Sequence, residues 1–244
     1  KQHQELAGYN FFNHRFLFGL LKMFSLLMLM NLVLLDSMLF AKQLSDIKEV
    51  SGSDFRPVSE SRVKLGRLLF YDNILSGNSN ISCGTCHHHK HHGSDGVSLG
   101  VGEGGSGIGL KRTSGKEDSR IKKRIPRNSP ALFNLGAKEI RVMFYDGRLS
   151  LGDEYENGFN SPAEEWLHEG LENLLAAQAL LPMASEFEMA GNSGENQVVG
   201  AIYDRIDKGW PIIAKKVRVI PEYGKLFVAA FDDISDPTQV KITH

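Results

Sequence analysis

The chain has 244 residues, 41% of them hydrophobic, and a formal net charge of −1. This length and hydrophobic content suffice for one sizeable core or two small ones. The nearly neutral charge gives no global attraction to nucleic acid or to anionic membranes, so we expect no nucleic-acid partner. The two cysteines are too close in sequence to form a useful structural disulfide, which indicates chemistry or covalent attachment instead.

Residues 1–41 are predicted to be upstream residues followed by a signal peptide or membrane anchor. A basic flank leads into an apolar run from Met23 to Ala41, as in a secretory signal. Asp36 interrupts this run, and Leu39 stands where a small residue is preferred. The apolar character begins at Phe16, which is also early enough for an uncleaved anchor. We expect export to the periplasm, with cleavage favoured over anchoring.

The middle of the chain begins with a polar segment, 42–57, which is predicted to be a linker. The run 59–72 ("SESRVKLGRLLFYD") starts with serines suited to capping a helix, and its apolar side chains fall near one helical stripe. Residues 73 to about 134 are rich in glycine and charge and are expected to form long loops.

Helical patterning returns in the last third of the chain. In 169–181 ("EGLENLLAAQALL") four leucines and Gln178 share one face, and 196–209 also has apolar residues at helical spacing. Pro211 and Pro221 each suit the first turn of a further short helix. No alternating strand of useful length is visible. The predicted fold class is therefore mostly α, with long loops.

The two cysteines lie in the sequence "SCGTCHHHKHH", and four interpretations compete for Cys83, Cys86 and His87. A thioredoxin-like dithiol would need a βαβ context, which is not visible. Structural zinc takes four ligands, but the histidines lack a regular spacing. A polar loop with incidental thiols is the third. In the fourth, both thiols bind the vinyl groups of haem and the next histidine is an axial iron ligand.

The haem interpretation explains the most residues, and it agrees with the export signal, because this attachment is made outside the cytoplasm in bacteria. We therefore predict one covalent haem c. The other histidines of this tract are expected to be surface loop residues, with a sixth iron ligand or a separate metal site as the alternative: His88, His89, His91 and His92.

Five segments occur in a familiar order: "LGRLLFYDNILSGNSNISCGTCHHH", "SDGVSLGVGEGG", "PRNSPALFNLG", "MFYDGR" and "AAQALLPMASEFEMAG". Together they resemble the N-terminal haem domain of the bacterial di-haem cytochrome c peroxidase family. That family also includes the di-haem enzyme that matures methylamine dehydrogenase. The resemblance spans about Ser59 to Gly191 and continues more weakly to Phe231. It implies a cytochrome c-like haem domain over residues 58–236.

The resemblance implies a role for each matching residue. Cys83 and Cys86 match the thioether cysteines, and His87 matches the proximal ligand of the peroxidatic haem. Gln178 and Glu188 match the distal glutamine and the distal acid/base. The implied activity is the reduction of hydrogen peroxide to water, with electrons from a small cytochrome or cupredoxin.

Four further positions follow from the same resemblance. Asn128 matches an asparagine that helps to hold calcium, and Arg127 could face a haem propionate. Glu103 stands at the position that carries a displaceable distal histidine in the family. Tyr145 replaces a tryptophan between the two haems, so it is either a redox-active catalytic residue or a packed core aromatic.

The family has a second haem domain, but no cysteine follows Cys86. We therefore expect half of a di-haem enzyme, with 237–244 as a truncated junction and no electron resupply in isolation. Two other functions stay open. A single-haem electron carrier would use Met143 as the second iron ligand. A di-haem oxidase of the maturation type would act on a protein substrate, and Tyr145 favours it.

Overall fold

The computed structural model describes residues 5–45 and 49–240. It divides into two compact units, 1–52 and 53–244. The predicted domain boundaries after residues 41 and 57 stay predictions, and the end of the predicted junction lies outside the described residues.

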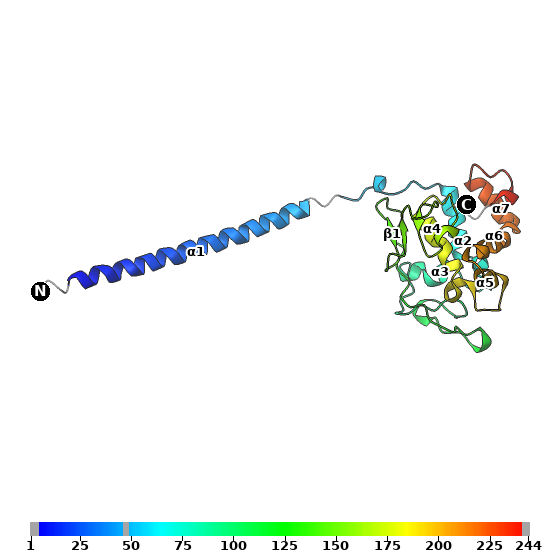
Figure 1. Ribbon diagram of the computed structural model, residues 1–244, viewed down its shortest axis with the longest axis horizontal. Coiled ribbons are helices and arrows are strands. Elements are labelled where there is room, and N and C mark those ends of the chain that lie inside the picture. The colour runs from blue at the N-terminus through cyan, green and yellow to red at the C-terminus, as the bar shows by residue number, and fades with distance from the viewer. Residues whose placement is uncertain (1–4, 46–48, 241–244) are drawn as a thin grey trace. The chain divides into compact units, whose positions relative to one another are not determined.

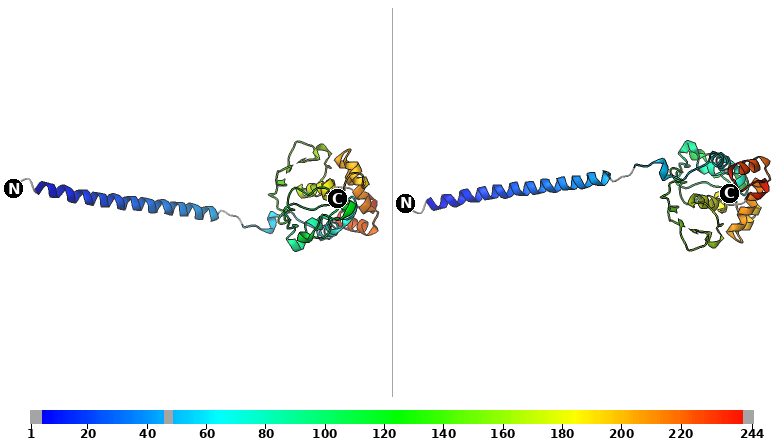
Figure 2. Two further views of the ribbon diagram at one scale, coloured as in Figure 1. Left: turned by 90° about the horizontal axis from the view of Figure 1, so that it is seen from below. Right: turned by 90° about the horizontal axis from the view of Figure 1, so that it is seen from above.

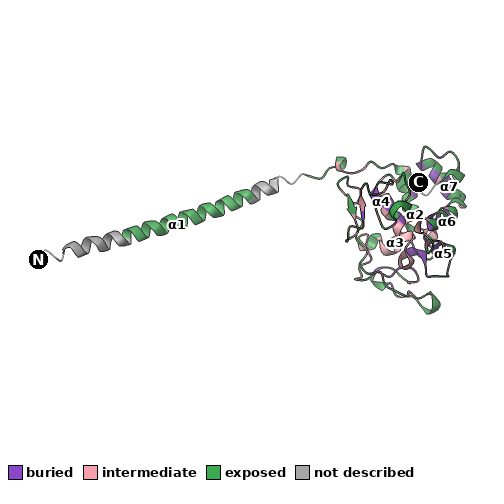
Figure 3. Cartoon of the chain, in the orientation of Figure 1, coloured by how far each residue is buried: buried purple, intermediate pink, exposed green. Residues whose placement is uncertain are grey.

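The first unit contains helix α1, Glu5–Ser45 (Figure 1). Its stretch Phe16–Leu39 has 24 residues and a mean hydropathy of 2.1. Every side chain of this stretch is exposed, as the green ribbon in Figure 3 shows. At 1.5 Å per residue the stretch is about 36 Å long, enough to cross the hydrocarbon core of a bilayer. Signal sequences and membrane anchors both have apolar helices of this kind.

The second unit is mostly helical with long loops, as the sequence predicts. Its α-helices are α2 Glu60–Tyr71, α3 Cys83–Cys86, α4 Leu174–Met183, α5 Gln197–Ile202, α6 Gly209–Arg218 and α7 Pro221–Ala230. A π-helix, η7, covers Glu186–Ala190. Single 3-10 turns occupy Gly52–Asp54, Asn73–Leu75, His89–His91, Gly109–Lys111, Glu117–Ser119, Glu164–Trp166, Ile206–Lys208 and Pro237–Gln239. In Figure 2 the C-terminal helices, orange to red, gather on one side of this unit.

Helix α2 forms where the capping serines predict it. The Ser59 hydroxyl accepts a hydrogen bond of 3.2 Å from the amide of Arg62, so one of the unpaired amides of the first turn is satisfied. Leu65 is buried and packs in a cluster with α7 side chains that include Tyr223 and Phe227. The predicted helix over 59–72 is confirmed.

Helix α4 begins later than the pattern in 169–181 predicts. The side chain of Asn173 accepts hydrogen bonds from Leu175 and Ala176, and the extended backbone of Asn173 ends the preceding loop. Gly170 has a positive φ of 81°, which an α-helix does not allow. The helix therefore starts at Leu174, and its buried face packs with Trp210 of α6.

The helix predicted over 196–209 is interrupted in the structure. Helix α5 ends at Ile202, and Arg205 has an extended backbone with φ −163°. The Arg205 guanidinium binds the Asp207 carboxylate two residues later, with an Nε–Oδ1 distance of 2.6 Å. By contrast, the predicted helix starts at Pro211 and Pro221 are confirmed, because both prolines lie in the first turns of α6 and α7.

A small antiparallel sheet precedes α4 in the chain and packs against it. Its strands are β1 Val142–Met143, β2 Leu149–Leu151 and β3 Phe159–Asn160, in the order β1-β2-β3. Met143 pairs with Leu149, and Leu151 pairs with Phe159. Strands of two or three residues are too short to show alternation in the sequence. Leu149 and Phe159 are buried in the same apolar cluster as α4 and Trp210.

Candidate functional site

Helix α3 holds both cysteines on a single turn. The amide of Ser82 donates to the Thr85 hydroxyl at 3.1 Å, and the two hydroxyls lie 3.2 Å apart, so the start of this short helix is capped. Cys83 and Cys86 are three positions apart and therefore share one face. Gly84 lets α3 approach α2 closely, since a Cβ there would lie 2.3 Å from the Tyr71 ring.

The two thiols are free and half-buried. Burial raises the pKa of Cys83 to about 11. Burial also raises the pKa of Cys86 to about 11, with the Arg112 guanidinium opposing this shift. Thiols of this kind are protonated at neutral pH, whereas the attacking cysteine of a redox dithiol has a lowered pKa. The described strands are antiparallel, so the thioredoxin-like interpretation has no structural support.

His87 directly follows α3, and its ring is oriented by two backbone carbonyls. Its Nδ1 lies 3.0 Å from Gly93 O and 3.0 Å from Pro130 O. Both neighbours are acceptors, so Nδ1 carries the proton and Nε2 keeps its lone pair. A histidine that ligates a metal through Nε2 uses this arrangement. The two thiols and this imidazole therefore fit a c-type haem.

The other histidines of the tract interact with one another and with Tyr71. The rings of His88 and His89 stack at 4.3 Å, and His89 Nδ1 lies 3.0 Å from the Tyr71 hydroxyl. The pKa of His88 is lowered by desolvation and then by the neighbouring positive groups. Within residues 5–45 and 49–240, no group of three or more histidine, cysteine, aspartate or glutamate side chains is arranged to hold a metal ion. The zinc interpretation thus gains no support.

Glu188 lies in the π-helix η7, and the loop after the histidine tract reaches it. The Cys86 thiol lies 3.9 Å from Val101 O. The next residue, Gly102, packs so closely on η7 that a Cβ would lie 1.8 Å from Phe187 O. The amide of Glu103 then donates to Glu188 O at 3.0 Å. The loop at 101–103 therefore brings η7 close to Cys86.

The Glu188 side chain is held in a poorly solvated environment. Burial raises the pKa of its carboxyl above the ordinary value, while Arg148 and the Ser185 hydroxyl act in the opposite direction. A raised carboxyl pKa brings the group closer to neutral pH, where a proton donor and acceptor is most effective. Glu188 is therefore not an ordinary exposed carboxylate.

Arg112 is a functional candidate that no sequence motif indicates. It is only 8% exposed. Its guanidinium donates to Val101 O at 2.6 Å, to Gly102 O at 2.7 Å and to Gly107 O at 2.8 Å. Each of the three guanidinium nitrogens donates to a backbone carbonyl, so this buried charge fixes the backbone around it. Arg112 therefore holds the loop that lies between Cys86 and Glu188.

Glu103 is buried, and its carboxylate accepts hydrogen bonds from side-chain amides. Its Oε1 accepts a hydrogen bond from Asn78 at 2.9 Å and another from Asn80. A carboxylate bound in this way is held in place and does not stand free as an iron ligand.

Gln178 is half-buried on α4, and α4 packs against η7. The two candidate distal residues, Gln178 and Glu188, therefore come from adjoining elements. Met143 lies on β1 and packs on the apolar cluster around Leu149 and Trp210. This position favours a structural role for Met143 over the iron-ligand role of an electron carrier.

Tyr145 and Arg127 form a pair at the surface. The Arg127 guanidinium carbon lies 3.3 Å from the centre of the Tyr145 ring, as in a cation–π interaction. Tyr145 is 65% exposed. The alternative that Tyr145 is a packed core aromatic is therefore wrong.

Asn128 connects two loop segments. Its amide nitrogen donates to Asp95 Oδ1 at 2.8 Å and to Val97 O at 2.7 Å, and its Oδ1 accepts from the Ser94 hydroxyl at 3.2 Å. Asp95 is 1% exposed. Asp95 belongs to the segment "SDGVSLGVGEGG", but no sequence pattern marks it as a site residue. A calcium role for Asn128 stays a prediction.

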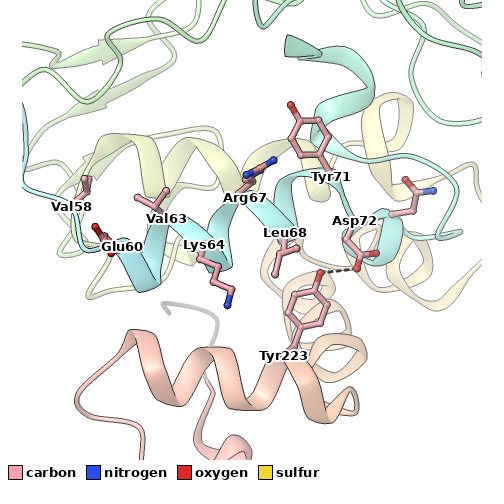
Figure 4. Close-up of a pocket in the computed structure, with 10 residues that line it drawn as sticks. Val58, Glu60, Val63, Lys64, Arg67, Leu68, Tyr71, Asp72 and Tyr223 are labelled. Carbon is pink, nitrogen blue, oxygen red and sulfur yellow. Dashed lines mark hydrogen bonds between the residues drawn. The ribbon is translucent and has the colours of Figure 1, made fainter. Parts of the chain in front are cut away.

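A hollow of about 920 Å³ lies between α2 and α7 (Figure 4). Its lining includes Val63, Arg67 and Tyr71, and the Tyr223 hydroxyl donates to Asp72 Oδ2 there at 2.7 Å. None of the residues assigned to the haem site lines this hollow. We therefore assign it no part in the chemistry.

A mostly helical domain that presents two thiols and an imidazole with a free Nε2 on one short turn has the character of a c-type haem protein. The comparison with known families makes this specific. Residues 60–244 match the di-haem cytochrome c peroxidase family, and the chain belongs to that family. The family implies haem c as the cofactor.

Two individual relatives illustrate the likeness. The cytochrome c551 peroxidase of Pseudomonas aeruginosa is 32% identical over 129 residues, which cover 52% of this chain and 31% of that protein. A solved structure described as a MauG-like protein associated with microbial copper homeostasis matches at 24% identity with a TM-score of 0.40. That match covers 78% of this chain and 38% of the other. The chain thus spans about a third of the length of these relatives.

Proposed function

We propose that this chain is the peroxidatic haem domain of a di-haem peroxidase that reduces hydrogen peroxide to water. The observation that carries the proposal is the position of Glu188. Its half-buried carboxyl has a raised pKa, and its backbone is bound to the loop that packs on Cys86. Electrons would come from a small cytochrome or cupredoxin through a second haem domain.

The residues that would hold the cofactor are Cys83 and Cys86, through thioether bonds, and His87, through Nε2. When bound, haem c supplies a redox-active iron. The hydrogen bonds from His87 Nδ1 to Gly93 O and Pro130 O make the imidazole a more basic ligand. Arg127 is the proposed partner of a haem propionate.

On the distal side, Glu188 is proposed to move a proton between the two oxygens of peroxide. Cleavage of the O–O bond needs this transfer, and a carboxyl whose pKa is raised by burial holds a proton more readily than an ordinary carboxyl, so it can take up the proton and pass it on. The amide of Gln178 can orient peroxide by hydrogen bonding, and a neutral amide does not compete as an iron ligand. Asn128 is proposed to help hold calcium.

Helix α1 supports export to the periplasm, either as a cleaved signal or as a membrane anchor. Haem attachment of this kind and the use of small exported electron donors are consistent with that location.

The proposal is tested by mixing the haem-loaded chain with hydrogen peroxide in a stopped-flow spectrometer. Glu188→Gln keeps the size of the side chain but removes its titration, so we expect the peroxide reaction to slow by roughly 10²–10⁴-fold with unchanged haem content. Glu186→Gln is the matched control, because Glu186 lies in the same π-helix and is also half-buried. An unchanged rate in Glu188→Gln would remove Glu188 from the mechanism.

The exposure of Tyr145 favours a second candidate, an oxidase of the maturation type that acts on a protein substrate. A tyrosine that is 65% exposed beside a cation is accessible to a macromolecule. This candidate predicts that peroxide-treated protein shows a tyrosyl radical signal in electron paramagnetic resonance and that Tyr145→Phe abolishes it. The peroxidase proposal instead predicts the same peroxide reaction rate in Tyr145→Phe and wild type.

A further inference from the structure

The two carbonyls that orient His87 belong to different segments of the chain. Gly93 O is in the loop directly after the histidine tract, whereas Pro130 O is in the irregular segment 124–130. Both oxygens lie 3.0 Å from the same Nδ1. The orientation of the imidazole therefore depends on how residues 93–97 are held against residues 127–130.

These two segments are joined by a compact set of hydrogen bonds. Asn128 donates to Asp95 Oδ1 and to Val97 O. The Ser94 hydroxyl donates to Ser129 O at 2.7 Å and lies 3.2 Å from Asn128 Oδ1. Each of these hydrogen bonds joins the two segments. Ser94 directly follows Gly93, and Ser129 directly precedes Pro130.

Asp95 is the most deeply buried member of this set. Its Oδ1 also accepts a hydrogen bond of 3.2 Å from the amide of Val97. Its Oδ2 is buried and accepts no hydrogen bond from any described residue. A buried carboxylate oxygen without a partner is unfavourable, so an aspartate here needs a compensating role. Fixing the amide of Asn128 is a role that its contacts provide.

We propose that Asp95 and Asn128 are positioning residues for His87. Together they hold the carbonyls of Gly93 and Pro130 at Nδ1. This keeps the proton on Nδ1 and leaves the lone pair of Nε2 to bind the haem iron. Outer hydrogen bonds of this type raise the basicity of a ligating imidazole and stabilise the oxidised metal. The inference rests on the assignment of His87 as the axial ligand.

The test uses the haem-loaded chain and two measurements that do not depend on turnover. These are the midpoint reduction potential of the haem and the iron–histidine stretching frequency in the resonance Raman spectrum. Asn128→Ala and Asp95→Ala should shift the potential upward and the frequency downward, because weaker hydrogen bonding at Nδ1 makes the imidazole less basic. Asp95→Asn keeps an oxygen acceptor for Asn128 and should restore most of both values.

Ser94→Ala provides a milder variant in case the larger changes prevent folding. It removes one hydroxyl that bonds across the two segments, so the same shifts in smaller size are expected. Asn157→Ala is the matched control, because it also removes amide-to-carbonyl bonds, to Glu164 and Leu167, in another loop. Unchanged potential and frequency in all three of Asn128→Ala, Asp95→Ala and Ser94→Ala would overturn the proposal.

Two further measurements separate this proposal from others. If a chelator shifts the wild-type values to those of Asn128→Ala while Asp95→Ala leaves them unchanged, Asn128 acts through a bound cation and not through Asp95, and the proposal is overturned. His87→Gly should lose the iron–histidine band. If the band persists in His87→Gly, the ligand assignment itself fails. If the band is lost but the Asp95 and Asn128 variants resemble wild type, only the positioning role fails.

Discussion

The backbone amide of Glu103 donates a hydrogen bond of 3.0 Å to the carbonyl of Glu188. This bond joins the loop after the haem-binding motif to the π-helix that carries the proposed acid/base. Gly102, the residue before it, is in direct contact with Phe187 and leaves no room for a side chain. The position of Glu188 therefore depends on backbone contacts with this loop.

Gly102→Ala should distort this contact. The added methyl group would lie 1.8 Å from Phe187 O, and a backbone carbonyl cannot move away without shifting η7. We expect a loss of unfolding free energy of about 1–3 kcal/mol and a slower peroxide reaction. Chemical denaturation and stopped-flow mixing measure the two effects.

Gly66→Ala is the control for this substitution. Gly66 lies within α2, and a Cβ there meets nothing within 4 Å. Alanine in an open helical position should stabilise the chain by about 0.5–1 kcal/mol and leave the peroxide reaction unchanged. If the two substitutions change the free energy of unfolding equally, the contact between Gly102 and Phe187 does not contribute to stability.

The pH dependence of stability should report the burial of Glu188. Burial raises the pKa of this carboxyl in the folded chain above its ordinary value of 4.5. Between the two pKa values the folded state holds more protons than the unfolded state, so the free energy of unfolding falls as pH rises through this window. Glu188→Gln removes that fall, because glutamine stays neutral.

We therefore expect Glu188→Gln to be more stable than wild type at neutral pH and to have nearly the same stability below pH 4.5. Denaturation curves at about pH 4 and about pH 7 measure the difference. A glutamine variant that is less stable than wild type at neutral pH would contradict the burial of the charged carboxylate.

The cysteines of the haem-free chain should react slowly with alkylating reagents. Burial raises the pKa of both thiols to about 11, and only the thiolate reacts. We expect the alkylation rate to rise roughly tenfold per pH unit from about pH 7 to 9, while a free cysteine levels off above about 8.5. Mass spectrometry follows the reaction, and a plateau near pH 8.5 would contradict the burial of the thiols.

The features that sequence predicts best are local. The spacing of Cys83, Cys86 and His87 can be read directly, and structure places all three on one turn. Helix α2 follows from the cap at Ser59, and α7 begins at Pro221 because proline suits a first turn. The helix break after Ile202 is less visible, because apolar spacing continues while Arg205 adopts an extended backbone.

The features that sequence does not predict depend on contacts between distant segments. Asp95 and Asn128 are 33 positions apart, and nothing near either residue shows that they bond. Arg112 stands in a basic stretch that resembles a solvated loop, yet its guanidinium is buried among backbone carbonyls. The exposure of Tyr145 likewise follows from its loop position and could not be read from the motif around it.

The central claim is that Cys83, Cys86 and His87 bind haem c covalently. The most direct measurement is the intact mass, under denaturing conditions, of the chain exported from cells that attach c-type haem. We predict the mass of the polypeptide plus one haem, and loss of that haem when Cys83→Ser and Cys86→Ser are combined. A wild-type mass equal to that of the polypeptide alone, or haem retained by the double variant, would contradict the claim.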